Sequence, residues 1–209
     1  GQSVAMEIPY RPRRWRYFSP ANAPRQDGTF ELHIGLVPGG QVSGPAVRSL
    51  KRGDAVRIGA PVGESLKLPE DTGRDVLMIA GGTGLAPFRA MLEQLDRRAA
   101  TQQVPRVHLF HGARMPWNLY EHKQLSNLTQ RPWFSYTPVV SDDTSYPGQR
   151  GQVGAVAAGH GPWAGRAALV CGSPAMVRHT VAELTAAGVP ATAIHTESLG
   201  TTTSAGSQQ

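Results

Sequence analysis

The sequence has one cysteine, Cys171, and no long hydrophobic run in its 209 residues. A single cysteine excludes an internal disulfide and is typical of proteins of a reducing compartment. No stretch reaches the roughly 18 apolar residues of a membrane-spanning helix, and no basic segment followed by an apolar one marks a leader at the N-terminus. The cysteine and the seven histidines show no spacing typical of metal ligands. These absences predict a cytoplasmic protein that holds no metal.

Acidic residues are scarce in the first quarter of the chain. Residues 1–53 hold eight arginines and lysines against three acidic residues, so most of the net charge of +6 lies there. The segment RPRRWR at residues 11–16 combines arginines with an aromatic residue, which would suit nucleic acid through phosphate contacts and base stacking. A cofactor phosphate or an acidic protein partner needs the same charges, and we favour these two over nucleic acid.

Glycines cluster at the end of an apolar run, in the stretch DVLMIAGGTGLAPF at residues 75–88. Residues 76–80 predict a buried strand, and the chain then passes through Gly81, Gly82, Thr83 and Gly84 into a helix with Pro87 in its first turn. Glycines allow an anion to approach the backbone closely, and the N–H groups at the start of a helix can bind phosphate oxygens. The stretch predicts a site for the diphosphate of a nucleotide. GGTG departs from the spaced glycines of the common dinucleotide fingerprint, however, and such a turn can also serve packing alone.

Hydrophobic patterning divides the chain into two modules. Short strands are predicted at residues 2–8, 15–19, 30–37 and 55–60. Later strands, at residues 76–80, 107–111, 136–140, 167–171 and 191–195, alternate with helical patterns, which predicts a parallel sheet covered by helices on both faces. We therefore expect a β-barrel at residues 1–71, an α/β module at residues 72–199 and a flexible tail at residues 200–209. Four strands cannot close a barrel without open edges, so the barrel is expected to lack its first strands.

The order of the modules and several motifs resemble the ferredoxin–NADP reductase family. RYFS at residues 16–19 resembles the family's Arg-x-Tyr-Ser flavin motif, and GQVS at residues 40–43 resembles its Gly-x-x-Ser/Thr phosphate motif. The glycine turn, CGSP at residues 171–174 and Glu197 extend the match over nearly the whole chain. The chain looks most like the reductase portion of flavohaemoglobins and oxygenase reductases. The resemblance implies a Greek-key, FAD-binding β-barrel followed by a doubly wound parallel sheet that binds NAD(P).

This resemblance implies roles for residues of the first module. Arg16 would bind the flavin diphosphate, Phe18 would stack on the flavin ring in place of the family's usual tyrosine, and Ser19 would hydrogen-bond flavin N5. Phe18 could also be an ordinary core aromatic, and His33 an ordinary strand histidine. The FAD-binding residues that the resemblance implies are Arg16, Tyr17, Phe18, Ser19, His33, Ile34, Gly40, Gln41, Val42 and Ser43.

In the second module, the resemblance places Cys171 beside the nicotinamide without a nucleophilic role, and Glu197 where it would set the nicotinamide and the proton balance near flavin N5. Ser19, Cys171 and Glu197 are the implied catalytic residues. Arg114 would favour a 2′-phosphate on the nucleotide whereas Asp142 would repel it, and we lean slightly to NADH. The NAD(P)-binding residues that the resemblance implies are Gly81, Gly82, Thr83, Gly84, Pro87, Arg114, Ser141, Asp142, Cys171, Gly172, Ser173, Pro174 and Glu197.

The implied activity is that of an FAD-dependent oxidoreductase. It would take hydride from NADH or NADPH and pass single electrons to a globin haem, in a domain or a partner of the nitric oxide dioxygenase type. An iron–sulfur oxygenase system is an alternative acceptor. A further alternative is an electron-transfer subunit that keeps the flavin but does not turn over a nicotinamide.

Overall fold

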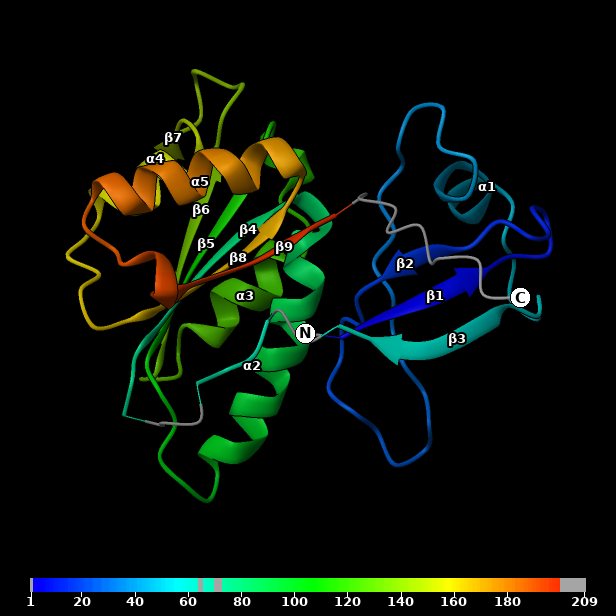
Figure 1. Ribbon diagram of the computed structural model, residues 1–209, viewed down its shortest axis with the longest axis horizontal. Coiled ribbons are helices and arrows are strands. Elements are labelled where there is room, and N and C mark those ends of the chain that lie inside the picture. The colour runs from blue at the N-terminus through cyan, green and yellow to red at the C-terminus, as the bar shows by residue number, and fades with distance from the viewer. Residues whose placement is uncertain (1, 64–65, 70–72, 200–209) are drawn as a thin grey trace.

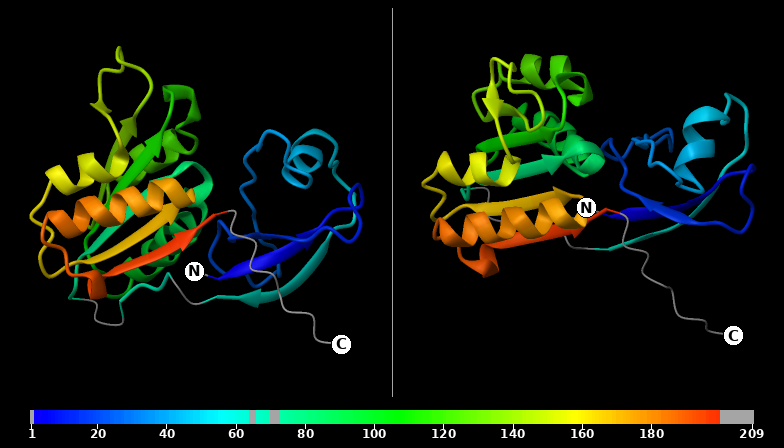
Figure 2. Two further views of the ribbon diagram at one scale, coloured as in Figure 1. Left: turned by 45° about the horizontal axis from the view of Figure 1, so that its top comes forward. Right: turned by 90° about the horizontal axis from the view of Figure 1, so that it is seen from above.

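Two modules lie side by side in the computed structural model, which describes residues 2–63, 66–69 and 73–199 (Figures 1 and 2). A small β-rich module comes first, and a larger α/β module follows it. The expected boundary between residues 71 and 72 and the expected tail at residues 200–209 lie outside the described residues. No helix within the described ranges has the length and hydrophobicity needed to cross a membrane.

The β-rich module contains a three-stranded antiparallel sheet with the order β2-β1-β3. Its strands are β1 (Ser3–Glu7), β2 (Arg16–Phe18) and β3 (Arg57–Val62). Side chains alternate along β1, so Met6 and the following Ile8 pack into a small core with Val42 and Ala46 at the short helix α1 (Ser43–Arg48). The opposite face of β1 therefore remains free to line a ligand site.

The expected strand at residues 30–37 does not form. Within the described part of the chain, its only strand-like contact is an isolated antiparallel bridge between Leu32 and Pro20, although its residues are rich in β-formers. Its residues contact the α/β module, with His33 next to Tyr120 and Gly35 next to Thr83, and a glycine within the segment weakens strand pairing. It runs as an extended loop instead, and Val37 at its end is strongly exposed.

The α/β module is built on six parallel strands in the order β7-β6-β5-β4-β8-β9. The strands are β4 (Val76–Gly81), β5 (Val107–Ala113), β6 (Phe134–Val140), β7 (Gln149–Arg150), β8 (Ala167–Gly172) and β9 (Ile194–Ser198). Nearly every side chain of β4 and β8 is buried, as expected for central strands covered on both faces. The predicted doubly wound parallel sheet is thus confirmed.

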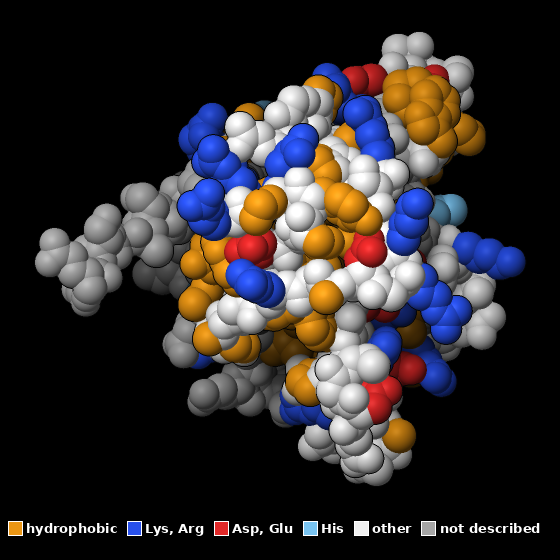
Figure 3. All heavy atoms as spheres, turned by 90° about the vertical axis from the view of Figure 1, so that its right-hand side faces the viewer, with side chains coloured by type: hydrophobic (Ala, Val, Ile, Leu, Met, Phe, Trp, Pro, Cys, Tyr) orange, Lys and Arg blue, Asp and Glu red, His pale blue; other side chains and the backbone are white. Residues whose placement is uncertain are grey.

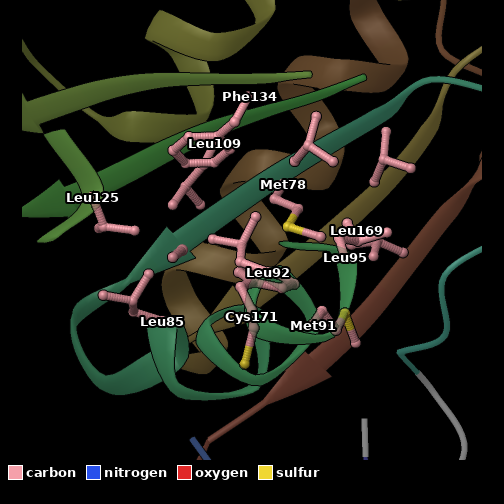
Figure 4. Close-up of a cluster of buried hydrophobic side chains, with 14 of the residues drawn as sticks. Met78, Leu85, Met91, Leu92, Leu95, Leu109, Leu125, Phe134, Leu169 and Cys171 are labelled. Atoms are coloured by element: carbon pink, nitrogen blue, oxygen red, sulfur yellow. The ribbon is translucent and has the colours of Figure 1, made fainter. Parts of the chain in front are cut away.

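Helices cover both faces of this sheet (Figure 1). The helices α2 (Leu85–Ala99) and α3 (His122–Leu128) share one core with the sheet, and α4 (Val153–Gly159) and α5 (Pro174–Ala186) share the other. Figure 4 shows the first core, where Leu92 and Leu95 of α2 meet side chains of neighbouring strands such as Met78 and Leu169. The spacing of Leu92 and Leu95 along α2 places them on one apolar face of the helix, as the sequence pattern indicates.

Some elements differ from the sequence expectation. Residues 191–193 form a turn of 3-10 helix rather than the start of a strand, and pairing with β8 begins only at Ile194. The helices α1 and α4 and the short strand β7 were not predicted, because the sequence around them is rich in turn-forming residues.

The strand order reverses between β4 and β8. Chain connections run outward through β5, β6 and β7 on one side of this point and through β9 on the other. In open parallel sheets, ligands bind beyond the carboxyl ends of the strands at such a switch point. The carboxyl end of β9 faces the β-rich module (Figures 1 and 2), so a ligand at this edge would lie next to that module.

Candidate active site

A cavity of about 1380 Å³ lies between the two modules. Part of its wall comes from β1, β2, β3 and the loop before α1, and part comes from the glycine turn after β4 and from the end of β9. The predicted site residues that line it are Arg16, Tyr17, Phe18, Ser19, His33, Gly40, Gln41, Val42 and Ser43 from the first module and Thr83 and Glu197 from the second. Residues far apart in the sequence therefore surround one space.

The loop GQVS is folded too tightly to allow a side chain at its first position. A Cβ on Gly40 would lie 2.3 Å from Ser43 Oγ and 2.9 Å from the carbonyl oxygen of Val37. The backbone N–H of Val37 donates to Ser43 Oγ at 3.3 Å. In the same cavity lining, the Arg16 guanidinium donates to the carbonyl of Trp15 at 2.9 Å and has no carboxylate partner in the described part of the chain. An arginine without a counter-charge beside a polar loop fits a phosphate-bearing group such as FAD.

A polar cluster joins the two modules at the cavity wall. Ser3 Oγ donates to Glu197 Oε1 at 2.8 Å, and Ser19 Oγ donates to the same oxygen at 3.2 Å. The other carboxylate oxygen, Glu197 Oε2, is buried and has no hydrogen-bond partner among the described residues. Two hydroxyls of the first module thus hold one oxygen of a carboxylate of the second module and leave the other oxygen open to accept a hydrogen bond from a ligand.

Ser3 was not among the residues expected at the site. The signal for it lies in the alternation of β1, where Val4 and Met6 enter the core and Ser3 and Ala5 line the cavity on the opposite face. A polar residue at a position facing away from the core could have been noticed. Its partner Glu197 lies 194 residues away, so the contact itself could not be predicted from spacing.

His33 and Ile34 have different surroundings. Ile34 packs against the small core of the first module and does not line the cavity, so only its backbone could contact a flavin. The His33 ring lies at the module junction, where Nδ1 is 3.2 Å from the hydroxyl of Tyr120 and Nε2 is 3.0 Å from Glu31 Oε1. His33 therefore links the modules through its side chain, a role that the sequence did not indicate.

The glycine turn packs against the end of β8. A Cβ on Gly84 would lie 2.2 Å from the carbonyl oxygen of Cys171, so this position admits only glycine. Gly82 adopts a positive φ of 54°, and Pro87 is buried in the first turn of α2. Gly81 and Gly172 end the neighbouring strands β4 and β8. The sequence-predicted turn and the CGSP motif therefore meet at the switch point, beside the cavity wall formed by Thr83.

The thiol of Cys171 is fully buried under α2 (Figure 4). Burial raises its pKa far above the usual range of a thiol, and the nearby Glu197 carboxylate adds to this effect. A thiol that remains protonated is a poor nucleophile, which agrees with the packing role implied by the family resemblance.

Three other predicted residues lie at the outer carboxyl edge of the sheet, away from the cavity. Arg114 follows β5 and forms an ion pair with Asp142 after β6, with a distance of 3.2 Å from Nε to Oδ2. Ser141 Oγ donates to Asp142 Oδ1 at 2.5 Å. The two charges that gave conflicting indications of the nucleotide therefore bind each other.

Ser173 and Pro174 begin the helix α5. The Ser173 hydroxyl accepts a hydrogen bond from the backbone N–H of Met176 at 3.3 Å and so caps the helix. Pro174 is the first helical residue, where its missing N–H costs nothing. These contacts explain both residues structurally, and a contact with the nucleotide stays a prediction.

Comparison with known proteins identifies the two modules. Residues 1–66 match the model of the oxidoreductase FAD-binding domain, and residues 78–182 match that of the oxidoreductase NAD-binding domain. The reductase component of phenol 2-monooxygenase, DmpP, from Pseudomonas sp. (strain CF600) is 37% identical over 175 residues, which cover 81% of this chain and 48% of the relative. The NAD(P)H-flavin reductase of Aliivibrio fischeri is 34% identical over 145 residues, which cover 66% of this chain and 59% of the relative. The chain spans about half the length of the first of these relatives.

Solved structures agree with this assignment. The Amycolatopsis cytochrome P450 reductase GcoB superposes with a TM-score of 0.83 at 30% identity, over 95% of this chain and 60% of that chain. The flavohaem-like FAD/NAD-binding domain of the nitric oxide dioxygenase of Vibrio cholerae superposes with a TM-score of 0.77 at 19% identity, over 95% of this chain and 84% of that chain, and shares the fold. The chain therefore belongs to the ferredoxin reductase family of oxidoreductases, with an FAD-binding domain followed by an NAD-binding domain.

Proposed function

We propose that this chain is the part of a reductase that passes electrons from NAD(P)H through FAD to a one-electron acceptor. The observation that carries the proposal is the hydrogen bond between Ser19 of the FAD-binding domain and Glu197 of the NAD-binding domain at the wall of a shared cavity. Two ligands can exchange a hydride only if their sites open into one space, and this contact joins the two sites. FAD, when bound, supplies the conversion of a two-electron hydride into single electrons.

Within this function the chain's own residues bind and orient the ligands. Arg16 is free to pair with the diphosphate of FAD, and Ser43 and its loop lie on the same cavity wall. Phe18 and Tyr17 supply apolar surface for a flat ring. The open oxygen Oε2 of Glu197 would accept a hydrogen bond from the nicotinamide or from a proton-bearing group beside it. The buried thiol of Cys171 stays protonated and packs in the core with α2, so it does not act as a nucleophile.

We propose NADH as the preferred donor. Binding of a 2′-phosphate at the outer edge of the sheet would require Arg114 to leave its ion pair with Asp142, and the carboxylate left behind would repel the phosphate. NADH lacks that phosphate and leaves the pair intact. Both residues are substantially exposed, so the preference is expected to be modest.

We propose that the acceptor belongs to an oxygenase system. The sequence placed a globin haem first, but relatives with at least 30% identity include reductase components of phenol 2-monooxygenase and of terephthalate 1,2-dioxygenase, whereas the nitric oxide dioxygenase shares only the fold at 19% identity. An iron–sulfur protein or an oxygenase that contains haem is therefore the acceptor to be tested first, and a globin is to be tested second.

The test is the visible spectrum of the purified protein loaded with FAD, before and after anaerobic addition of NADH or NADPH at equal concentrations. We expect an oxidised flavin band that is bleached faster by NADH. A yellow protein bleached by neither nucleotide would contradict the proposed turnover and favour an electron-transfer subunit. A protein that takes up no FAD would contradict the assignment of the cavity.

A further inference from the structure

The hydrophobic cores of the two domains are separate among the residues that the structure describes. The small core around Met6 and Val42 takes all its residues from the first domain, and the two cores of the parallel sheet take theirs from Leu66 onward. Other hydrophobic side chains of the first domain are exposed, and Figure 3 shows such side chains scattered between basic ones on the side turned away from the sheet. Contacts outside the cores therefore fix one domain against the other.

Residues 31–35, which we call the spacer segment, contact the second domain at two points. His33 Nδ1 lies 3.2 Å from the hydroxyl of Tyr120, and the two rings meet edge to face with their centroids 5.2 Å apart. Gly35 lies against the glycine turn, where a Cβ at this position would be 3.2 Å from Cγ2 of Thr83. His33, Gly35 and Thr83 all line the proposed flavin cavity. The spacer segment therefore meets the second domain at the wall of that cavity.

The side chain of His33 is held from both sides. Its Nε2 is 3.0 Å from Glu31 Oε1, and Arg25 pairs with the other carboxylate oxygen at 3.8 Å. A neutral imidazole that donates from Nε2 to the carboxylate presents Nδ1 as an acceptor, so the Tyr120 hydroxyl donates to it. Tyr120 in turn packs against the core of the second domain. A directional hydrogen bond between two anchored side chains fixes the distance between their domains.

The spacer segment is also tied to the flavin motif of its own domain. The backbone N–H of Ala21 donates to the carbonyl of Glu31 at 2.8 Å, and Leu32 forms a β-bridge with Pro20. Pro20 directly follows Ser19, which lines the cavity. A displacement of the spacer segment would therefore also displace this part of the cavity wall.

We propose that the spacer segment sets the distance over which hydride passes between the nicotinamide and the flavin, an inference that rests on the proposed function. His33 and Gly35 are its positioning residues. His33 holds the segment to Tyr120, and the absence of a side chain at Gly35 allows the segment to approach the glycine turn closely. The rate of transfer depends steeply on this distance, because a misplacement of about 1 Å can cost on the order of a hundredfold.

The first test removes the hydrogen bond across the junction. Tyr120→Phe keeps the ring but loses the hydroxyl that donates to His33. Tyr136→Phe is the matched control, because the contacts of the Tyr136 hydroxyl, with His111 and His122, lie within the second domain. Each protein is loaded with FAD, and anaerobic stopped-flow absorbance follows reduction of the flavin over a range of NADH concentrations. Dithionite serves as a reductant that needs no nucleotide site.

We expect the limiting rate of reduction by NADH to fall roughly fivefold in Tyr120→Phe, as the loss of one hydrogen bond predicts. The NADH concentration at half-saturation and the rate of reduction by dithionite should not change. Tyr136→Phe should keep the rate of the unaltered protein. Equal losses in the two variants, or an equal loss with dithionite, would overturn the proposal, since a general loss of structure or a damaged flavin site would then explain the result.

The second test inserts a wedge at Gly35 and then relieves it. Gly35→Ala directs its Cβ at Thr83 Cγ2, whereas the control Gly44→Ala adds a Cβ with nothing within 4 Å. We expect the limiting rate to fall about threefold in Gly35→Ala and to stay unchanged in the control. Thr83→Ser removes the methyl group and keeps the hydroxyl, so Gly35→Ala/Thr83→Ser should regain the rate of Thr83→Ser alone. A double variant as slow as Gly35→Ala would overturn the proposal.

The outcome for the unaltered protein separates this inference from the proposed function. If the unaltered protein holds FAD and is reduced by dithionite but not by NADH, the proposed function is contradicted, and the inference with it, because no hydride transfer is left to position. If NADH reduces the unaltered protein, Tyr120→Phe and Gly35→Ala at the same rate, the inference alone is overturned.

Discussion

Removal of the Ser3 hydroxyl tests whether the junction between the domains positions Glu197 for the reaction. In the Ser3→Ala variant, Glu197 Oε1 loses its shorter donor, at 2.8 Å, and keeps only Ser19 at 3.2 Å. A hydrogen bond to a charged group contributes about 1.5–3 kcal/mol. Ser3 is half-buried and Ser19 remains as a second donor, so we take the lower end of this energy range, about 1.5 kcal/mol. If this energy orients the carboxylate for hydride transfer, the rate should fall roughly tenfold.

The assay is anaerobic stopped-flow reduction of the FAD-loaded protein over a range of NADH concentrations. We expect the limiting rate of flavin reduction to fall while the concentration of NADH at half-saturation changes little, because Ser3 lies at the FAD-binding side of the cluster. Ser3→Thr retains a hydroxyl at the same position and should recover most of the rate. A merely structural role for Ser3 would lower thermal stability in Ser3→Ala without this recovery pattern.

A double-mutant cycle decides whether the effect passes through Glu197. In the Glu197→Gln background the charged acceptor is gone, so the further change Ser3→Ala should alter the limiting rate much less than in the unaltered protein. If Ser3→Ala slows reduction equally in both backgrounds, Ser3 acts by another route and the reasoning is refuted.

Three more changes have expected outcomes. Burial lowers the pKa of His111 to about 4 from 6.5, with a smaller effect of the nearby charge of His122, so the unfolded chain takes up this proton at a higher pH than the folded chain. Its contribution to the free energy of unfolding should therefore fall by about 2 kcal/mol from pH 7 to pH 5, and urea denaturation should show that much less pH dependence in His111→Leu than in the unaltered protein. Gly84→Ala should lower the free energy of unfolding by about 1–3 kcal/mol because its Cβ would meet backbone atoms. In Gly44→Ala the added Cβ lies in open space, so the free energy of unfolding should not fall; thermal unfolding measures both variants. Asp142→Ala should raise the ratio of kcat/KM for NADPH to kcat/KM for NADH about fivefold, equivalent to about 1 kcal/mol. Steady-state kinetics that show no change in this ratio would contradict the proposal that Arg114 and its ion pair set the nucleotide preference.

The sequence predicted the α/β domain better than the β-rich domain. Buried strands such as Val76–Gly81 are continuous apolar runs between clear helical patterns, so periodicity and the glycine turn locate them. The segment at residues 30–37 was predicted wrongly for a physical reason. Its side chains favour a strand, but His33 and Gly35 contact the α/β domain, and how the domains meet is not revealed by sequence patterning.

The same distinction applies to the candidate site. Motifs of consecutive residues, RYFS, GQVS and GGTG, contribute residues to one cavity, and the structure brings them together as expected. Contacts between distant residues were missed, including Ser3 with Glu197 and His33 with Tyr120, because each depends on how the domains meet. The ion pair between Arg114 and Asp142 was missed as well, because it joins residues that follow two different strands.

The junction between the domains is held by directional polar contacts, and this has a consequence for catalysis. Glu93 Oε2 of α2 accepts from the backbone N–H of Ala23 at 3.1 Å, Arg97 donates to the carbonyl of Pro24 at 3.1 Å, and Glu197 accepts from two serines. Hydrogen bonds depend on distance and angle more sharply than apolar packing does, so they fix the position of one domain relative to the other. Because the two proposed ligand sites are contributed by different domains, a small change in these contacts would alter the distance over which hydride must pass. Residues remote from both ligands, such as Glu93 on α2, should therefore influence the rate of flavin reduction without contacting either one.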